Sequence, residues 1–360
     1  MNYKGDKEMT YNLDYTQTAV LLAAYEQKKK PTTFLKSRYF PDGTNFGTDQ
    51  VLVEYKNGNQ KIAPFVAPEV GGKVVKRDGY TVKSYQPAFI APKRAMSVDT
   101  LKRKGFGEAY YNQLSPAERA LAITADDLAE MDEMIVRREE AMCAEVMQNN
   151  ALVMKHYTDN NELYETKHIF YYDGEANSAI YTPTKSWTEA DADILADCAV
   201  IAAGMKRRGL AATDIILGSE AADAVLNNEK IQKLLDNRNY NIGAIDPTLQ
   251  FDDVVVLGQL NCKGHLLNFI QYVGTYEAED GTVKDYINPK DIIVTAPACG
   301  QTNYGAITQI DYGQADFTTH VGKRVPLYEV AGQVKSVALR TAPLVQPVNK
   351  DPFIKATVVF

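Results

Sequence analysis

A strand-like but strongly basic segment limits most sharply how this chain can fold. The stretch GGKVVKRDGYTVKSYQPAFIAPKRAMS, residues 71–97, is rich in β-branched and aromatic residues, yet it carries six cations against the single anion Asp78. The turn signals Asn57-Gly58 and Asp78-Gly79 predict two β-hairpins, and four prolines interrupt the same region. Because two hairpins with proline-broken edges cannot build a core, we expect a long projecting arm. Its six cations are Lys73, Lys76, Arg77, Lys83, Lys93 and Arg94.

A long acidic helix follows the arm. Ser115 is a candidate N-cap, Pro116 suits the first helical position and Glu118 completes a capping box, so the sequence predicts a helix over about residues 115–150. An apolar stripe at helical spacing supports it. The other faces carry eight carboxylates against two arginines, and Glu133 alone has a cation, Arg137, four residues ahead. A partner from outside the helix would balance this charge, although a merely solvated acidic face is the alternative. The stripe consists of Leu128, Met131, Ile135, Met142 and Val146.

The flanking regions predict mixed α and β structure. Residues 14–31, DYTQTAVLLAAYEQKKKP, have the pattern of a short amphipathic helix. After residue 187 an α/β pattern begins, with a helix over about residues 189–208 capped by Thr188, a buried strand at DIILG and two further short helices. The remainder is rich in strands. The fold class expected from these elements is α+β.

Motifs for catalysis, metal binding and membrane insertion are missing from the sequence. It has no G-x-x-x-x-G-K-[ST], G-x-S-x-G or H-E-x-x-H, and its four histidines are scattered singly. The four cysteines lack C-x-x-C spacing, which favours buried reduced thiols over a zinc site or disulfide framework. The longest apolar run near the start, AVLLAA, is too short to span a membrane. We therefore expect a cytoplasmically made protein without catalytic residues, cofactor or metal.

The basic arm and the acidic helix are complementary. An arm without a core of its own could lie across the helix of a neighbouring copy, and such a head-to-tail contact generates rings or lattices. A role of the arm in contacting DNA is the alternative, although the acidic balance of the chain disfavours it. The helix residues expected at this interface are Asp126, Asp127, Glu130, Asp132, Glu133, Glu139 and Glu140.

The order of these parts resembles the lambda-type major capsid protein E family of tailed bacteriophages, which has the Hong Kong 97 fold. The resemblance is carried by YTQTAVLLAAYEQKKKPTTFLKSRYFP, by PFVAPEVGGKVVKRDGYTVKSYQPAFIAPKRAMSVDTL, by QYVGTYEAEDGTVKDYINPKDIIV with NYGAI, and by RTAPLVQPVNKDPFIKATVV. It implies five parts. These are an N-terminal arm (1–44), an extended loop (45–98), a peripheral domain (99–186) with the spine helix at about 115–150, an axial domain (187–325) and return strands of the peripheral domain (326–360).

The resemblance also implies a function and partners. Copies would form hexamers and pentamers of an icosahedral shell that encloses double-stranded DNA without sequence-specific contact, assembled in the bacterial host cytoplasm and located in the virion. Because the chain begins almost directly with the arm, a separate scaffolding protein is expected, together with a portal. A cementing protein on the shell is compatible with the family. Nothing places an acid beside Lys73, Lys76 or Asn57, so no covalent cross-link between subunits is expected.

Two other classes of protein remain open at this point. An encapsulin-type compartment would share the fold but package an enzyme. A soluble α/β enzyme would use the region of Asp252-Asp253 or His265 as its site.

Overall fold

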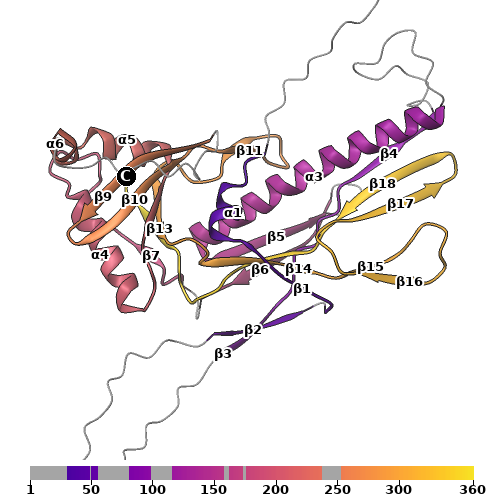
Figure 1. The fold of residues 1–360 in the computed structure, drawn as a ribbon, viewed down its shortest axis with the longest axis horizontal. Coiled ribbons are helices and arrows are strands. Elements are labelled where there is room, and N and C mark those ends of the chain that lie inside the picture. Colours follow the sequence, from indigo (N-terminus) through magenta and orange to yellow (C-terminus); the bar gives the residue numbers. More distant parts are fainter. Residues whose placement is uncertain are drawn as a thin grey trace, which may run out of the picture.

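A computed structural model describes residues 31–48, 50–55, 81–98, 116–157, 162–172, 176–236 and 253–360. The helix expected over residues 14–31 and both turn signals of the arm lie outside the described residues. Figure 1 shows an elongated molecule in which one long helix, α3, runs along a layer of strands, while a smaller α/β unit lies at one end of that layer.

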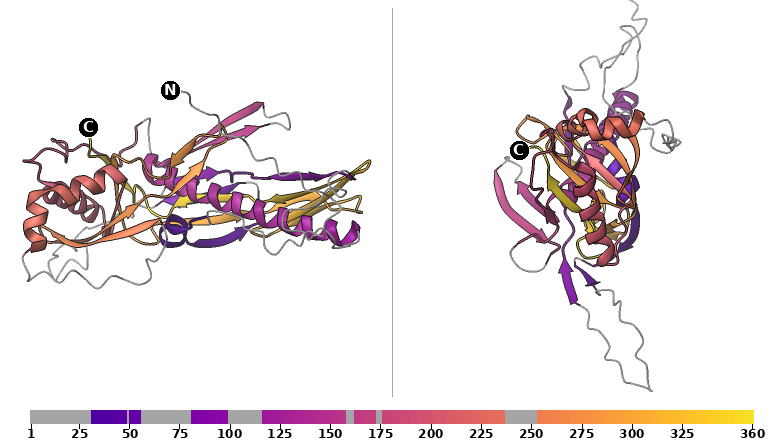
Figure 2. Two further views of the ribbon diagram at one scale, coloured as in Figure 1. Left: turned by 90° about the horizontal axis from the view of Figure 1, so that it is seen from above. Right: turned by 90° about the vertical axis from the view of Figure 1, so that its left-hand side faces the viewer.

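Helix α3 extends from Pro116 to Asn149, 34 residues in all. Met131, Ile135, Met142 and Val146 are buried, so the apolar stripe faces the strands beneath. After the helix, Asn150 adopts a left-handed conformation with φ 49° and the chain turns into strand β5. The side views show the other elements of this half gathered along the length of α3 (Figure 2).

The layer beneath α3 is built from several small sheets. One sheet has the order β1-β14-β19 and another has the order β17-β18-β4, while β15–β16 and β5–β6 form two-stranded sheets. The short helix α1, Phe34–Tyr39, packs near the C-terminal half of α3. The strands are β1 (Asp42–Phe46), β4 (Lys93–Met96), β5 (Ala151–Tyr157), β6 (Leu163–Phe170), β14 (Gly300–Gly305), β15 (Ile307–Ile310), β16 (Phe317–His320), β17 (Val325–Ala331), β18 (Val334–Arg340) and β19 (Pro343–Pro347).

The α/β unit, called the axial unit below after the axial domain expected from the sequence, is built on a six-stranded sheet with the order β7-β20-β13-β8-β10-β9. Its core is a separate apolar cluster that includes Trp187 and Phe269. The strands are β7 (Ile180–Tyr181), β8 (Asp214–Leu217), β9 (Val254–Cys262), β10 (His265–Tyr272), β13 (Asp291–Thr295) and β20 (Ile354–Thr357). The helices are α4 (Ile194–Arg207), α5 (Ser219–Asn227) and α6 (Glu229–Asp236), and a small hairpin joins β11 (Thr275–Glu277) to β12 (Val283–Asp285).

Strand pairing moves two boundaries expected from the sequence. The axial domain was expected over 187–325, but β14 pairs with β1 and β19, so residues after about 300 belong to the layer under α3. The return strands 326–360 were expected in the peripheral domain, but β20 pairs with β13 in the six-stranded sheet. Helix α4 begins at Ile194 with Asp193 as its N-cap, later than the expected cap Thr188. These pairings join residues far apart in the chain, which local patterns do not report.

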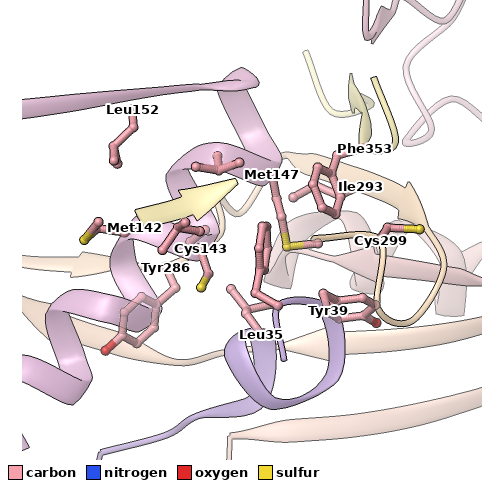
Figure 3. Close-up of a cluster of buried hydrophobic side chains, with 14 of the residues drawn as sticks. Leu35, Tyr39, Met142, Cys143, Met147, Leu152, Tyr286, Ile293, Cys299 and Phe353 are labelled. Carbon is pink, nitrogen blue, oxygen red and sulfur yellow. The ribbon is translucent and has the colours of Figure 1, made fainter. Parts of the chain in front are cut away.

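The apolar cluster under α3 joins the N-terminal helix to the rest of the chain. Figure 3 shows Leu35 and Tyr39 of α1 facing the same cluster as Cys143 and Met147 of α3. Phe40 stacks on Phe353 with ring centroids 5.1 Å apart. The chain therefore enters the structure already anchored to its spine helix.

The described part of the arm forms a ribbon that takes one strand from each of the two expected hairpins. Strand β2, Val51–Tyr55, pairs antiparallel with β3, Thr81–Tyr85, so the first strand of the first expected hairpin meets the last strand of the second. The segment 56–80 between them lies outside the described residues. Figure 1 shows the ribbon standing away from the layer of strands, and the Leu52 side chain on it is 69% exposed.

Candidate inter-subunit contact surface

Three of the six arm cations lie within the described residues, and each contacts its own chain. Lys83 donates a hydrogen bond from Nζ to the backbone oxygen of Tyr172 at 2.8 Å. Lys93 of β4 pairs with Glu329 of β17, with 2.5 Å between Nζ and Oε2. The other three, Lys73, Lys76 and Arg77, lie outside the described residues.

Arg94 binds the arm base to the spine helix of the same chain. Its guanidinium lies 2.8 Å from Asp127 Oδ1 and 2.5 Å from Glu130 Oε2. The hydrogen bond with Asp127 is the largest cause of a raised Arg94 pKa, and Glu130 adds to it despite partial burial. The i,i+4 pairing rule considers only cations on the helix itself. It could not predict Arg94, because Arg94 lies on β4.

Arg324 neutralises the next part of the helix. Its guanidinium lies 2.7 Å from Asp132 Oδ1 and 2.8 Å from Glu139 Oε1. Burial alone would lower the pKa of Arg324, but the hydrogen bonds and charges of these two carboxylates raise it above its ordinary value. Glu139 also pairs with Lys36 of α1 and accepts a hydrogen bond from the Tyr304 hydroxyl at 3.2 Å.

Glu140 caps helix α1 from the side. Its carboxylate accepts hydrogen bonds from the backbone N–H groups of Leu35 at 2.7 Å and Lys36 at 3.0 Å, and from the Tyr272 hydroxyl at 3.1 Å. Burial raises the pKa of Glu140 to about 7, although these donors and the Lys36 charge act in the opposite direction. The carboxylate thus satisfies N–H groups in the first turn of a helix that has no side-chain cap of its own.

The expectation that Glu139 and Glu140 meet a neighbouring subunit is wrong in this structure, since both side chains are 0% exposed. The expectation that the helix lacks partners within the chain is also corrected. Buried carboxylates need hydrogen bonds and countercharges, and the long-range fold supplies them through Lys36 and Arg324, which sequence reasoning missed. The excess of carboxylates on the helix indicated that cations from elsewhere would bind it. It did not indicate which cations these are.

A smaller set of helix carboxylates reaches the surface. Asp126 is exposed, and the Asp132 side chain remains 51% exposed while bound to Arg324. Glu133 pairs with Arg137 at 3.2 Å, the i,i+4 pair expected from the sequence. The candidate contact surface is therefore defined by Asp126, Asp127, Glu130, Asp132 and Glu133 on α3, and by the ribbon β2–β3.

Two other kinds of site, a metal centre and a membrane-spanning helix, were looked for among the described residues. These residues hold no group of three or more metal-binding side chains. No helix within them is long and apolar enough to cross a bilayer.

The long spine helix over strands, the separate α/β unit and the projecting ribbon define the Hong Kong 97-type capsid fold, as expected. The crystal structure of a prophage capsid protein from E. coli CFT073 superposes with a TM-score of 0.61 at 19% identity, covering 92% of this chain and 94% of that one. The mature capsid of bacteriophage PhiM1 gives a TM-score of 0.51 at 10% identity, covering 95% and 91%.

The chain belongs to the family described as phage major capsid protein E, whose sequence model matches residues 17–358. The major capsid protein of Enterobacteria phage P21 is 26% identical over 301 residues, 81% of this chain and 83% of its own length. That of Escherichia phage lambda is 24% identical over 305 residues, 82% and 84%. The expected family and function are thus confirmed: this is a phage major capsid protein, located in the virion shell.

Proposed function

We propose that copies of this chain form hexamers and pentamers that close an icosahedral shell around double-stranded DNA. The observation that carries the proposal is the ribbon β2–β3. Its two strands pair only with each other among the described residues. Tyr85 at its base packs into the cluster under α3, but the strand pairing of a two-stranded ribbon by itself is only marginally stable in water. A neighbouring copy would cover it and pair its free edges.

Charge sets how the ribbon docks in this proposal. Lys73, Lys76 and Arg77, which lie between β2 and β3 in the sequence, would with Lys83 face the outer carboxylates of α3 on the next copy. Lys93 and Arg94 already bind Glu329 and α3 within the chain, so they would fix the base of the arm. Charge complementarity mainly supplies register and orientation, and apolar burial would supply most of the affinity.

Further partners belong to the same proposal. A scaffolding protein and a portal would take part in assembly in the cytoplasm of a bacterial host, and a cementing protein could bind the finished shell. The net charge of −7 suits a wall that does not trap DNA, which would be packaged without sequence-specific contact. The subunit would act without catalysis or cofactor.

Electron microscopy of the purified chain, alone and co-expressed with a scaffolding protein from the same phage genome, tests assembly directly. Closed shells, tubes or ring-shaped capsomers with five or six subunits are expected. Monodisperse single subunits under both conditions would contradict the proposal.

Reversing the arm charges should block shell formation while leaving the subunit folded. We expect the triple variant Lys76→Glu, Arg77→Glu, Lys83→Glu to lower the shell yield by about tenfold or more, because like charges would then meet across the contact. Sedimentation measures the yield, and circular dichroism checks that the melting temperature is unchanged.

A charge-swap variant provides the matched control. Adding Asp126→Lys, at an exposed carboxylate of α3, to the triple variant should restore part of the yield if the arm meets α3 of a neighbour. Asp126→Lys alone, which leaves the arm intact, should give a smaller loss. A full yield of shells from the triple variant would exclude the pairing of arm and helix.

A further inference from the structure

Two cysteines far apart in the sequence lie side by side in the axial unit. Cys198 is on α4, and Cys262 is the last residue of β9, the edge strand of the six-stranded sheet. Both are 0% exposed and belong to the same apolar cluster. The spacing of the cysteines had favoured isolated buried thiols, and it gave no sign of this pair.

Contacts around the pair show that α4 and the end of β9 are firmly apposed. Lys263, the residue after Cys262, forms an ion pair with Asp193, the N-cap of α4, at 3.1 Å. The two thiols lie near enough that each is the largest cause of the other's pKa shift, upward for Cys198 and downward for Cys262. Figure 1 shows both elements at the same end of the molecule. The other two cysteines, Cys143 and Cys299, belong to the cluster under α3 (Figure 3).

We propose that Cys198 and Cys262 are a latent disulfide site that links helix α4 to the edge strand β9. Formation of the Sγ–Sγ bond removes one proton from each thiol and two electrons from the pair. A two-electron oxidant must accept those electrons: a peroxide is reduced to water, and a diazene such as diamide to the hydrazine. No backbone segment has to cross the molecule, because both side chains belong to the same buried cluster, on elements that the Lys263–Asp193 ion pair holds together.

The disulfide would stabilise the axial unit only under oxidising conditions. Reducing conditions in a cytoplasm keep the thiols free while the chain folds. A virion outside the cell meets oxidising conditions, and a cross-link over the 64 positions from Cys198 to Cys262 would then restrict the unfolded axial unit strongly. This inference needs only the fold and the virion location, so it can fail while shell assembly succeeds.

Oxidation of the full chain with diamide tests the proposal. We expect two of the four thiols to be lost and a Cys198–Cys262 peptide to appear in non-reducing mass spectrometry. The melting temperature of the axial unit should rise by about 5 °C or more and return on reduction. Peroxide should give the same linked peptide more slowly.

Single-thiol variants serve as controls. Cys198→Ala and Cys262→Ala should each abolish both the linked peptide and the melting shift, whereas the double variant Cys143→Ala, Cys299→Ala should keep both. Because the buried alanine replacements could lower stability, the decisive comparison is oxidised against reduced protein within each variant. Four free thiols in the treated native chain, or a linked peptide involving Cys143 or Cys299, would overturn the proposal.

Discussion

Glu140→Ala is expected to lower the free energy of unfolding by about 3–5 kcal/mol, because removing one partner from a buried polar network leaves the others unsatisfied. The backbone N–H groups of Leu35 and Lys36 and the Tyr272 hydroxyl all donate to this carboxylate inside the core. Each buried donor without an acceptor costs about 1–3 kcal/mol. The expected fall in melting temperature is about 10 °C.

Glu140→Gln is the matched control. Its amide oxygen can accept the hydrogen bonds that Leu35 and Tyr272 donate to Oε1, but its amide nitrogen cannot accept from the Lys36 N–H. Glu140→Gln should therefore lose less stability than Glu140→Ala while removing the charge. Circular dichroism at 222 nm follows α3, and the fluorescence of Trp187, the single tryptophan in the chain, follows the axial core separately. A melting temperature for Glu140→Ala within error of the wild type would refute the capping role of Glu140.

The same comparison has an expected pH dependence. The folded pKa of Glu140, about 7, lies above its ordinary value of 4.5. Protonation therefore favours the folded chain, and the stabilisation, complete below pH 4.5, is lost as the pH rises to about 7. Relative to Glu140→Gln, the wild type should lose up to roughly 3 kcal/mol over this range. The groups facing Glu140 are Lys36, Tyr272, Cys143 and Glu139, and they are the same in both proteins. Urea unfolding at pH 5 and pH 8 measures the difference.

Trp187→Ala should destabilise the axial unit by about 3–5 kcal/mol, since it creates a large cavity in a packed core. Trp187 is 2% exposed, and its indole Nε1 donates to Asp197 Oδ2 of α4 at 3.0 Å. Its backbone N–H also bonds the Val358 oxygen at 2.8 Å, just after β20. The residue therefore ties the start of the axial unit to the C-terminal strand.

Trp187→Phe separates packing from hydrogen bonding. It retains most of the apolar volume and removes the donor to Asp197, so we expect a loss of about 1–2 kcal/mol. Hydrogen exchange of α4 and β20, read by mass spectrometry, should increase strongly in the alanine variant and weakly in the phenylalanine variant. Increased exchange confined to α3 in either variant would show that the two cores are not separate as inferred.

The anchoring of α1 has a consequence for how the chain presents its arm. Lys36 and Glu140 fix the chain just after residue 31, and Arg94 fixes it again where the arm returns. Both ends of the segment 42–94 are thus held on α3. A neighbour that engages the ribbon β2–β3 would therefore transmit force directly to the spine helix.

The amino-acid sequence by itself determined what depends on near neighbours in the chain. The cap at Ser115-Pro116 and the stripe from Leu128 to Val146 predicted a helix that the structure describes from Pro116 to Asn149. The buried run DIILG located β8 of the α/β unit. The missing catalytic motifs and the quoted family segments pointed to a shell protein, and the family match over residues 17–358 agrees.

Only the tertiary structure decided which distant residues meet. Arg94, Arg324 and Lys36 come from three other parts of the chain and form ion pairs with carboxylates of α3. Much of the negative charge of α3 is therefore balanced within the same subunit. The pairing of β20 with β13 moved a domain boundary, and the packing of α4 near β9 brought Cys198 and Cys262 into one buried cluster. Periodicity and capping report interactions within a few residues, whereas sheet order, buried ion pairs and thiol contacts depend on how whole elements pack.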